Sequence, residues 1–403
     1  MSGLEELLQA AQRARAEHPH VPLAIATLHA VEGSSYRQPG ARLLVDAEGR
    51  VVAGAVSGGC LEGDIATHAA AVCANGIPKR LTYDLRDDLQ TIWGFGAMCD
   101  GVAHVLLEPL GDGGWLEAAC AMRADRQGGA LVTVLEETPD GGTREWQHAS
   151  AALRAAAAAL AHAATHTAHC ASGEVVMPAV ATRAQATSEV ATSAAASSDA
   201  TSDDTADNAA STDVRWRCLV DPLAPPVSLV LVGAGRGAEA FAQIARTLGW
   251  RVTLIDHRPF VLQGLTLPEE VQRIVARADD GVQHMTTDAR TAVALLTHQF
   301  AMDAEWLARV LPLPIGYVGV LGSRRRAEQL MDSLRSSGLE ITPRMQRMLH
   351  APIGLDLGGE SPESIALAAI AEIEAIMHGR PGGSLRERQS PIHARTPTPH
   401  SAS

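Results

Sequence analysis

One stretch decides the fold of the second half of this chain: Val227-Ser228-Leu229-Val230-Leu231-Val232-Gly233-Ala234-Gly235-Arg236-Gly237-Ala238. Its apolar run is typical of a parallel strand that is buried on both faces, and its glycines allow a tight turn into a helix. The next strand, at 251–255, ends in Asp256. This acid lies about 20 residues after Gly235, where a Rossmann fold carries a ribose-binding carboxylate. We therefore predict an α/β fold here, a Rossmann-like doubly wound parallel sheet.

The glycine turn is also a candidate nucleotide site. Gly233, Gly235 and Asp256 occupy the positions that contact NAD(P) in dinucleotide-binding folds. The last glycine of that fingerprint is Ala238 here, and amides at a helix start hold other phosphates equally well. Because such a fold is a scaffold for many activities, a purely structural role for the turn stays open.

A row of arginines, Arg324, Arg325 and Arg326, opens a later helix. Positive charge at a helix N-terminus is unfavourable unless an anion balances it. A bound phosphate or an acidic partner therefore explains the row as well as a solvated surface does. We interpret His298, which follows another predicted strand, as a loop or core histidine.

Composition limits the class of protein. A chain of 403 residues with 46% hydrophobic residues can bury two or three domain cores. Its net charge of −13 argues against nucleic-acid binding, which needs clustered lysine and arginine. Six scattered cysteines indicate a reducing cytoplasm and no disulfide framework. We find neither a signal-peptide core nor an apolar run of membrane-spanning length.

Three glycine-rich loops dominate the first half of the chain. The loop at 57–64 holds Cys60 beside two glycines and an acidic pair, the loop at 32–42 combines hydroxyls with two cations, and the loop at 93–101 carries Cys99. Short strands and amphipathic helices alternate around them, which indicates an α+β domain. We expect these three loops to line one pocket.

The two thiols are the candidate reactive groups of that pocket. Glycines beside Cys60 remove side chains that would keep a ligand away, and a thiolate is both a nucleophile and a soft metal ligand. Neither Cys60 nor Cys99 lies in a CxxC pair or near a histidine pair, so the pattern does not indicate a structural zinc site. The alternative is that both are ordinary small buried residues.

Composition also predicts the domain organisation. We assign 1–160 together with 214–224 to the N-terminal domain and 225–380 to the Rossmann-like domain. Residues 161–213, rich in Ala, Thr and Ser, carry too little apolar surface to offset the entropy of ordering, so we predict a disordered insert. Residues 381–403, rich in Pro, Ser and His, are predicted to be a disordered tail.

A weak internal repeat occurs within the N-terminal domain. The predicted strands at 130–136 and 217–223 resemble those at 23–28 and 102–110 in sequence. Either duplication of a half-domain or chance similarity of strand composition explains this.

These motifs together resemble the XdhC/CoxI family of maturation factors for molybdenum hydroxylases such as xanthine dehydrogenase. The resemblance covers both domains and excludes the insert and the tail. It rests on 32–37, 39–41, 57–63, 93–101, 233–235, 256–259, 297–298, 317–324 and 351–356.

The resemblance implies a chaperone without turnover of its own. Such a protein binds molybdenum cofactor, protects it, assists exchange of an oxo for a sulfido ligand with a cysteine desulfurase, and inserts the cofactor into an apo molybdenum hydroxylase. Cys60 then ligates molybdenum or relays a persulfide sulfur, and we expect a homodimer. The candidate cofactor contacts are Ser34, Ser35, Arg37, Gly58, Gly59, Cys60, Glu62, Cys99, Gly233, Gly235, Asp256 and Arg324.

One residue departs from the family pattern. Met98 stands before Cys99 where family members commonly have glycine, and its side chain occupies space through which a ligand would approach. Two other functions stay open. The first is an NAD(P)-dependent oxidoreductase that uses the Rossmann-like domain, and the second is a scaffold that recruits enzymes through its acidic surface.

Overall fold

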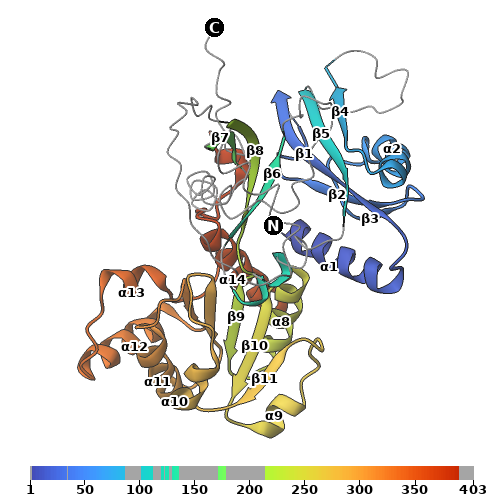
Figure 1. Cartoon of the computed structure of the whole chain (residues 1–403). Coiled ribbons are helices and arrows are strands. Elements are labelled where there is room, and N and C mark those ends of the chain that lie inside the picture. The colour runs from blue at the N-terminus through green and yellow to red at the C-terminus, as the bar shows by residue number, and fades with distance from the viewer. Residues whose placement is uncertain are drawn as a thin grey trace, which may run out of the picture. The chain divides into compact units, whose positions relative to one another are not determined.

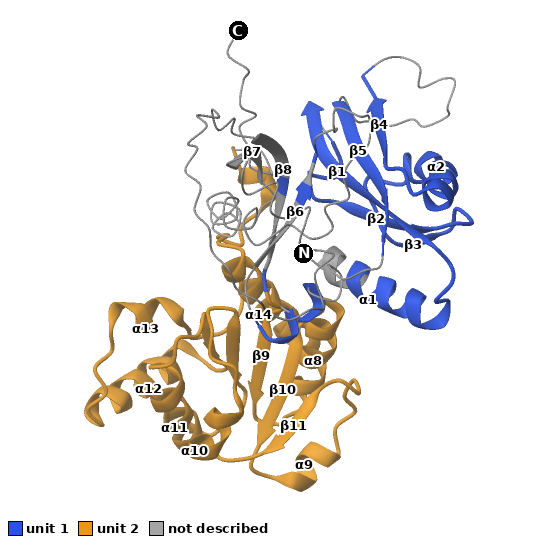
Figure 2. Cartoon of the chain, viewed as in Figure 1, with its two compact units in different colours: residues 1, 3–224, 393–403 blue, residues 2, 225–392 orange. Residues whose placement is uncertain are grey.

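The computed structural model in Figure 1 describes residues 2–33, 35–86, 101–111, 119–121, 123–126, 129–135, 171–177 and 214–389. The chain forms two compact units, coloured separately in Figure 2. Unit 1 contains Gly3–Ala224 with Met1 and His393–Ser403, and unit 2 contains Pro225–Ile392 with Ser2. Within the described ranges, no helix combines the length and apolarity that crossing a bilayer requires.

Unit 1 contains a five-stranded antiparallel sheet in the order β3-β2-β1-β5-β4 (Figure 1). Its elements are α1 (Ser2–Glu17), β1 (Leu23–Gly33), β2 (Arg42–Asp46), β3 (Val51–Gly54), α2 (Glu62–Asn75), β4 (Lys79–Asp84) and β5 (Gly101–Pro109). Side chains along β1 point alternately to the two faces of the sheet, and each face packs against its own hydrophobic core. Ala24 and Ala26 pack with Ile65 of α2, whereas Ile25 packs with Leu7 of α1.

A three-stranded antiparallel sheet completes unit 1, in the order β6-β8-β7. Its strands are β6 (Gly129–Val134), β7 (Ala171–Met177) and β8 (Val214–Leu223). Strand β7 lies inside 161–213, so the predicted disorder is wrong for 171–177, and the remainder of that segment lies outside the described residues. The prediction failed there because β7 draws its backbone hydrogen bonds from β8, which is distant in sequence.

The β1–β5 pair and the β6–β8 pair of unit 1 have corresponding registers. Ala24 of β1 pairs with Pro109 of β5, and Ala130 of β6 pairs with Pro222 of β8. The strands that resembled each other in sequence are therefore paired in the same way in both sheets. This correspondence favours the hypothesis of a repeated half-domain over chance similarity.

Unit 2 contains a six-stranded parallel sheet in the order β11-β10-β9-β12-β13-β14. This is the 3-2-1-4-5-6 strand order of a Rossmann fold, as predicted. The strands are β9 (Ser228–Val232), β10 (Arg251–Asp256), β11 (Gln272–Val275), β12 (Thr291–Leu295), β13 (Tyr317–Val320) and β14 (Leu349–His350).

Helices cover both faces of this sheet. One core joins Phe241 of α8 to Ile370 of α14, and the other joins Trp306 of α11 to Leu330 of α12. The helical elements are α8 (Gly237–Thr247), α9 (Pro259–Gln263), α10 (Ala278–Gly281), η2 (Val282–His284), α11 (Phe300–Val310), α12 (Arg324–Ser336), α13 (Pro343–Met348), α14 (Pro362–Met377) and η3 (Leu385–Glu387). Of the predicted tail, 381–389 is described and includes η3; the rest lies outside the described residues.

A partly buried polar network fixes α14 to the edge of the sheet. The hydroxyl of Tyr317 and the amide of Gly354 donate to Glu372, whose other oxygen lies 3.2 Å from Nδ1 of His350. The rings of Tyr317 and His350 stack with centroids 4.5 Å apart. Burial, followed by the hydrogen bond to Glu372, raises the pKa of the Tyr317 hydroxyl, which therefore remains a donor.

Candidate functional site

The strand ends that flank the three glycine-rich loops lie at one edge of the five-stranded sheet. Gly33, which ends β1, pairs with Gly101, which begins β5. The amide of Leu85, just beyond β4, donates to the carbonyl of Gly101 at 2.9 Å. Gly54, which ends β3, pairs with Leu43 near the start of β2. Because Leu43 also pairs with Ala26 of β1, Gly54 lies level with Ala26, seven residues before Gly33. The three loops therefore leave the same end of the sheet, and the anchor of the Cys60 loop is set back along the strands from the Gly33–Gly101 pair.

The Cys60 loop is held from inside by Glu62, the first residue of α2. The Glu62 carboxylate accepts the amides of Val56 at 3.1 Å and Ser57 at 2.8 Å, and also the Ser57 hydroxyl. Ser57 Oγ in turn accepts the amides of Gly59 and Leu61, both at 3.1 Å. This network fixes the loop and orients the turn that carries Cys60.

These bonds change the role predicted for Glu62. Burial raises the pKa of this carboxyl, but the hydrogen bonds from Ser57 and the loop amides outweigh it, so the pKa lies below its ordinary value. The negative charge of Glu62 is therefore already stabilised by hydrogen bonds within the loop. Glu62 supports the shape of the loop, and the cofactor contact that we predicted for it does not fit this geometry.

Cys60 itself is only partly buried, at the margin of the core between the sheet and α2. Among the described residues, neither its amide nor that of Gly58 has a hydrogen-bond partner. Cys73 on α2 is also half-buried, and burial, followed by the charge of Asp46, raises its pKa. A raised pKa disfavours the reactive thiolate, so Cys73 is a natural control for Cys60.

The loop that follows β1 contacts the Cys60 loop. The ring of Tyr36 lies 3.6 Å from the point where a Cβ would stand on Gly58. The guanidinium of Arg37 lies 5.7 Å from the centre of the same ring, within the range of a cation–π contact. Arg37 is exposed and Ser35 half-buried. The structure thus places Tyr36 and Arg37 next to Gly58, and the contact of Ser35, Arg37 and Gly58 with a cofactor stays a prediction.

In unit 2, Gly233 makes the close approach that its position requires. Its φ is +104°, and a Cβ there would lie 2.9 Å from the backbone of Leu296 and Thr297. The turns after β9 and β12 therefore touch at the carboxyl edge of the sheet. This is the point where the strand order reverses and where open α/β sheets bind ligands.

Asp256 is buried and fully engaged by the protein. One oxygen accepts the Ala234 amide at 2.7 Å and the Arg258 guanidinium at 2.9 Å, and the other accepts the amide and Nε of Arg258, both at 2.9 Å. Burial raises the pKa of Asp256, but the bonds from Arg258 and Ala234 outweigh it and lower the pKa to about 2. The ribose contact predicted for Asp256 therefore does not fit this geometry.

Comparison with known proteins decides the family. The model of the XdhC and CoxI family matches residues 16–84, and the model of the XdhC Rossmann domain matches residues 229–373. Together they span about half of the chain. The chain belongs to the XdhC/CoxI family. The resemblance identified from the sequence motifs is thereby confirmed.

Two relatives and one solved structure extend this comparison. The chain is 24% identical over 357 residues to a protein of Bacillus subtilis named as a probable xanthine dehydrogenase subunit, covering 87% of this chain and 91% of that protein. It is 31% identical over 163 residues to the uncharacterized protein YqeB of Escherichia coli, covering 40% of this chain and 30% of that protein. A crystal structure of a xanthine dehydrogenase from Bacillus halodurans shares the fold, with a TM-score of 0.65 at 23% identity over 94% of this chain and 97% of that one.

Two predicted contacts of this XdhC/CoxI family member, Ser34 and Cys99, lie outside the described residues. Gly33, next to Ser34, and Gly101, shortly after Cys99, are described. Gly59 adopts φ of +111° with open space where a Cβ would stand, so its glycine serves backbone conformation and not close packing.

A charged cluster near the same sheet edge was not predicted from the sequence. His104 Nε2 lies 3.4 Å from Glu32, and His104 Nδ1 lies 3.2 Å from the Thr82 hydroxyl. Arg86 approaches Glu32 at 3.8 Å and Asp84 at 2.8 Å. These residues are far apart in sequence and become neighbours only through strand register. They surround the base of the loop that carries Cys99.

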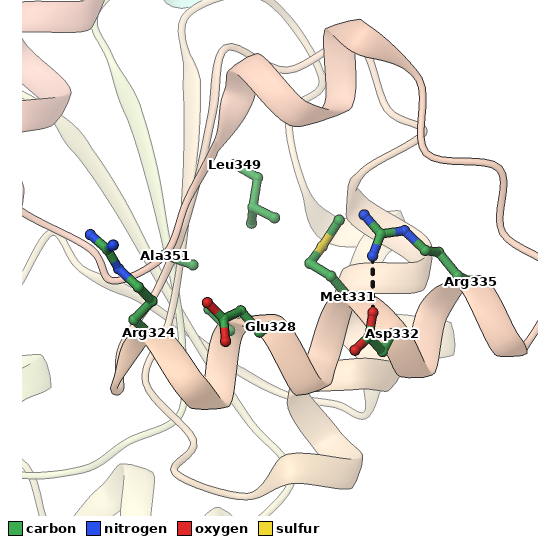
Figure 3. A pocket seen from close by; sticks show the side chains of 8 residues that line it. Arg324, Glu328, Met331, Asp332, Arg335, Leu349 and Ala351 are labelled. Carbon is green, nitrogen blue, oxygen red and sulfur yellow. Dashed lines mark hydrogen bonds and ion pairs between the residues drawn. The ribbon is translucent and has the colours of Figure 1, made fainter.

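Arg324, the last predicted contact, lies at the start of α12 and borders a pocket of about 500 Å³ (Figure 3). The pocket has an apolar floor and a charged rim, in which Asp332 pairs with Arg335 at 2.9 Å. It is lined by Arg324, Ala327, Glu328, Met331, Asp332, Arg335, Leu349 and Ala351. Arg324 therefore belongs to unit 2, whereas the loop that carries Cys60 belongs to unit 1.

Proposed function

We propose that this protein binds molybdenum cofactor, protects it, assists its sulfuration and inserts it into an apo hydroxylase of the xanthine dehydrogenase type. Family membership supports this proposal, and so does the Bacillus subtilis relative, whose name links it to xanthine dehydrogenase. The observation that carries it is the contact between the Tyr36 ring and Gly58, which joins the loop after β1 to the Cys60 loop, while Gly33 at the start of the former pairs with Gly101 beside the Cys99 loop.

The groups around Cys60 fit such a cargo. A thiolate is a soft ligand suited to molybdenum, and it can also carry a sulfane sulfur from a cysteine desulfurase. The unpartnered amides of Gly58 and Cys60 can donate to a pterin phosphate, and the exposed cation of Arg37 suits the same group. Bound cofactor supplies the redox-active molybdenum of the recipient enzyme, whereas the chain supplies binding, orientation and shielding.

The competing oxidoreductase function receives less support from the described residues. A dinucleotide site needs an acid that is free to bind ribose hydroxyls. Asp256 instead holds the glycine turn and Arg258. A desulfurase and an apo hydroxylase as partners, together with homodimer formation, complete the proposal for the chaperone.

The test is to produce the full chain in cells that make molybdenum cofactor and to measure the pterin that copurifies. We expect pterin with the wild type and a loss of at least about tenfold with Cys60→Ser, because a thiolate–metal contact is lost. Cys73→Ser is the matched control and should retain the wild-type amount. Equal pterin in all three proteins would remove Cys60 from the site.

A further inference from the structure

The carboxyl edge of the unit 2 sheet carries a group of unpaired basic side chains. Arg236 lies on the turn after β9, His298 on the turn after β12, and Arg324 and Arg325 at the start of α12 after β13. All four are exposed, and none has a hydrogen bond or ion pair with the described residues. We call them the edge cluster. It stands out on a chain whose net charge is −13.

The turns that carry the edge cluster are in contact with one another. Gly233 approaches the backbone of Thr297, as described above. The Thr297 hydroxyl donates to Asp303, which is fully buried and also accepts the Arg326 guanidinium at 2.7 Å. The turns after β9, β12 and β13 are thus linked by direct contacts, which places the edge cluster on adjoining segments of one edge.

The buried acids of this edge are already neutralised. Asp256 is paired with Arg258 and Asp303 with Arg326. Glu328, one turn along α12 from Arg324, forms no ion pair within 4 Å among the described residues and lines the pocket of Figure 3. The edge cluster therefore keeps its positive charge available to a ligand.

The backbone at His298 is held in an unfavourable conformation. Its φ is +57°, in the left-handed region that non-glycine residues rarely adopt. Thr297 fixes this turn by accepting the Gln299 amide at 3.1 Å while it donates to Asp303. Strain of this kind persists where the surrounding structure imposes it, and it is concentrated at functional sites. Here it fixes the backbone of His298 at the point where the strand order reverses.

We infer that this edge binds the terminal phosphate of a small molecule and does not recognise NAD⁺. Guanidinium groups suit a terminal phosphate because they donate parallel hydrogen bonds to a group with two or more negative charges. NAD⁺ offers only the two singly charged phosphates of its pyrophosphate bridge and relies on an acid for its ribose, which Asp256 does not provide. This inference concerns unit 2 and stands independently of Cys60.

The experiment is isothermal titration calorimetry of the full chain with inorganic pyrophosphate and with NAD⁺, at low ionic strength. We expect pyrophosphate to bind at least about tenfold more tightly than NAD⁺, and the binding to weaken with added salt. Arg236→Gln, Arg324→Gln and His298→Asn should each weaken pyrophosphate binding about five- to tenfold, since each removes one charged or N–H donor. Asparagine is chosen at position 298 because it tolerates left-handed backbone.

Arg335→Gln is the matched control, because Arg335 lies on the same helix but is paired with Asp332 away from the edge. It should bind pyrophosphate as the wild type does. Tighter binding of NAD⁺ than of pyrophosphate would overturn the inference, as would undetectable binding of pyrophosphate. Equal losses in Arg335→Gln and the edge variants would also overturn it, because they would indicate a general effect of charge.

Discussion

The ring of Tyr36 lies against the backbone of Gly58, 3.6 Å from the position that a Cβ would occupy. This contact joins the loop after β1 to the loop that carries Cys60. Tyr36 remains 65% exposed, so much of the side chain is accessible although it contacts Gly58 and lies near the Arg37 guanidinium. An aromatic side chain in this position can stack on a planar guest such as a pterin.

Replacing Tyr36 tests that contact. Tyr36→Ala should lower pterin retention about tenfold, since stacking and apolar burial of the ring are lost. Tyr36→Phe keeps the ring and should retain pterin normally. Gly58→Ala should also be tolerated, because its Cβ would meet the ring at ordinary contact distance. Pterin fluorescence after denaturation reports the outcome, and a normal yield from Tyr36→Ala would contradict the role of the ring.

Glu62→Gln tests the support of the Cys60 loop. An amide cannot replace both carboxylate oxygens as acceptors, so we expect a loss of about 2 kcal/mol in the free energy of unfolding. Chemical denaturation at neutral pH measures this loss. A difference below about 0.5 kcal/mol would show that the network around Ser57 does not depend on the charge.

The same variant has a defined pH dependence. Because the folded pKa of Glu62 lies below its ordinary value of 4.5, its stabilisation is complete above that value and is lost as pH falls through the folded pKa. The stability gap between wild type and Glu62→Gln should therefore shrink in acid. A constant gap between neutral pH and pH values below 4.5 would argue against this assignment.

Asp256→Asn tests the carboxylate that holds the glycine turn. The variant leaves Arg258 and the Ala234 amide without a full partner, so we expect about 2–3 kcal/mol of destabilisation. With a folded pKa of about 2 against an ordinary 3.8, the stabilisation is complete above pH 3.8 and declines as pH falls toward 2. Asp279→Asn, at an exposed site, should change stability by less than about 0.5 kcal/mol at neutral pH. Equal stability of both variants would disprove the internal role of Asp256.

Two glycines in unit 2 give a matched test of whether the backbone conformation and close packing require glycine. Gly233→Ala should cost about 3 kcal/mol, because it combines a positive φ with a 2.9 Å clash against the backbone of Leu296. Gly237→Ala, in the first turn of α8 with open space around it, should be neutral or stabilise by about 0.5 kcal/mol. Thermal unfolding of the two variants separates them, and a similar melting temperature for both would contradict the packing at Gly233.

The Rossmann unit could be predicted because its evidence is local. The apolar run that ends at Val232, the glycine turn and Asp256 follow one another within one β-α-β segment. Strand β9 is buried along its whole length, as is β12, and burial on both faces leaves a continuous apolar signal. Strand order and helix placement then follow from the handedness and packing rules of parallel sheets.

The sequence could not show that Glu62 and Asp256 bind their own turns. An acid beside a glycine turn has the same sequence signature whether it binds a ligand or the turn itself. The difference depends on distances to Ser57 in one case and to Ala234 and Arg258 in the other. The spacing of Asp256 and Arg258 did indicate the internal pair, because an acid and an arginine two residues apart can form a bidentate pair across a turn.

Strand β7 and the cluster around His104 were missed for a related reason. Both depend on register between segments distant in sequence: Ala171 with Val220, and His104 with Ala30. Strand pairing of this kind leaves little trace in composition. Low-complexity sequence around β7 concealed it further.

Whether the Cys60 loop binds molybdenum cofactor is decided by the molybdenum content of protein produced with the cofactor pathway, measured by inductively coupled plasma mass spectrometry. We expect molybdenum and pterin in equal amounts in the wild type and in Cys73→Ser, and at least about tenfold less of both in Cys60→Ser. Full loading of Cys60→Ser, with an unchanged molybdenum-to-protein ratio, would contradict a site at the Cys60 loop.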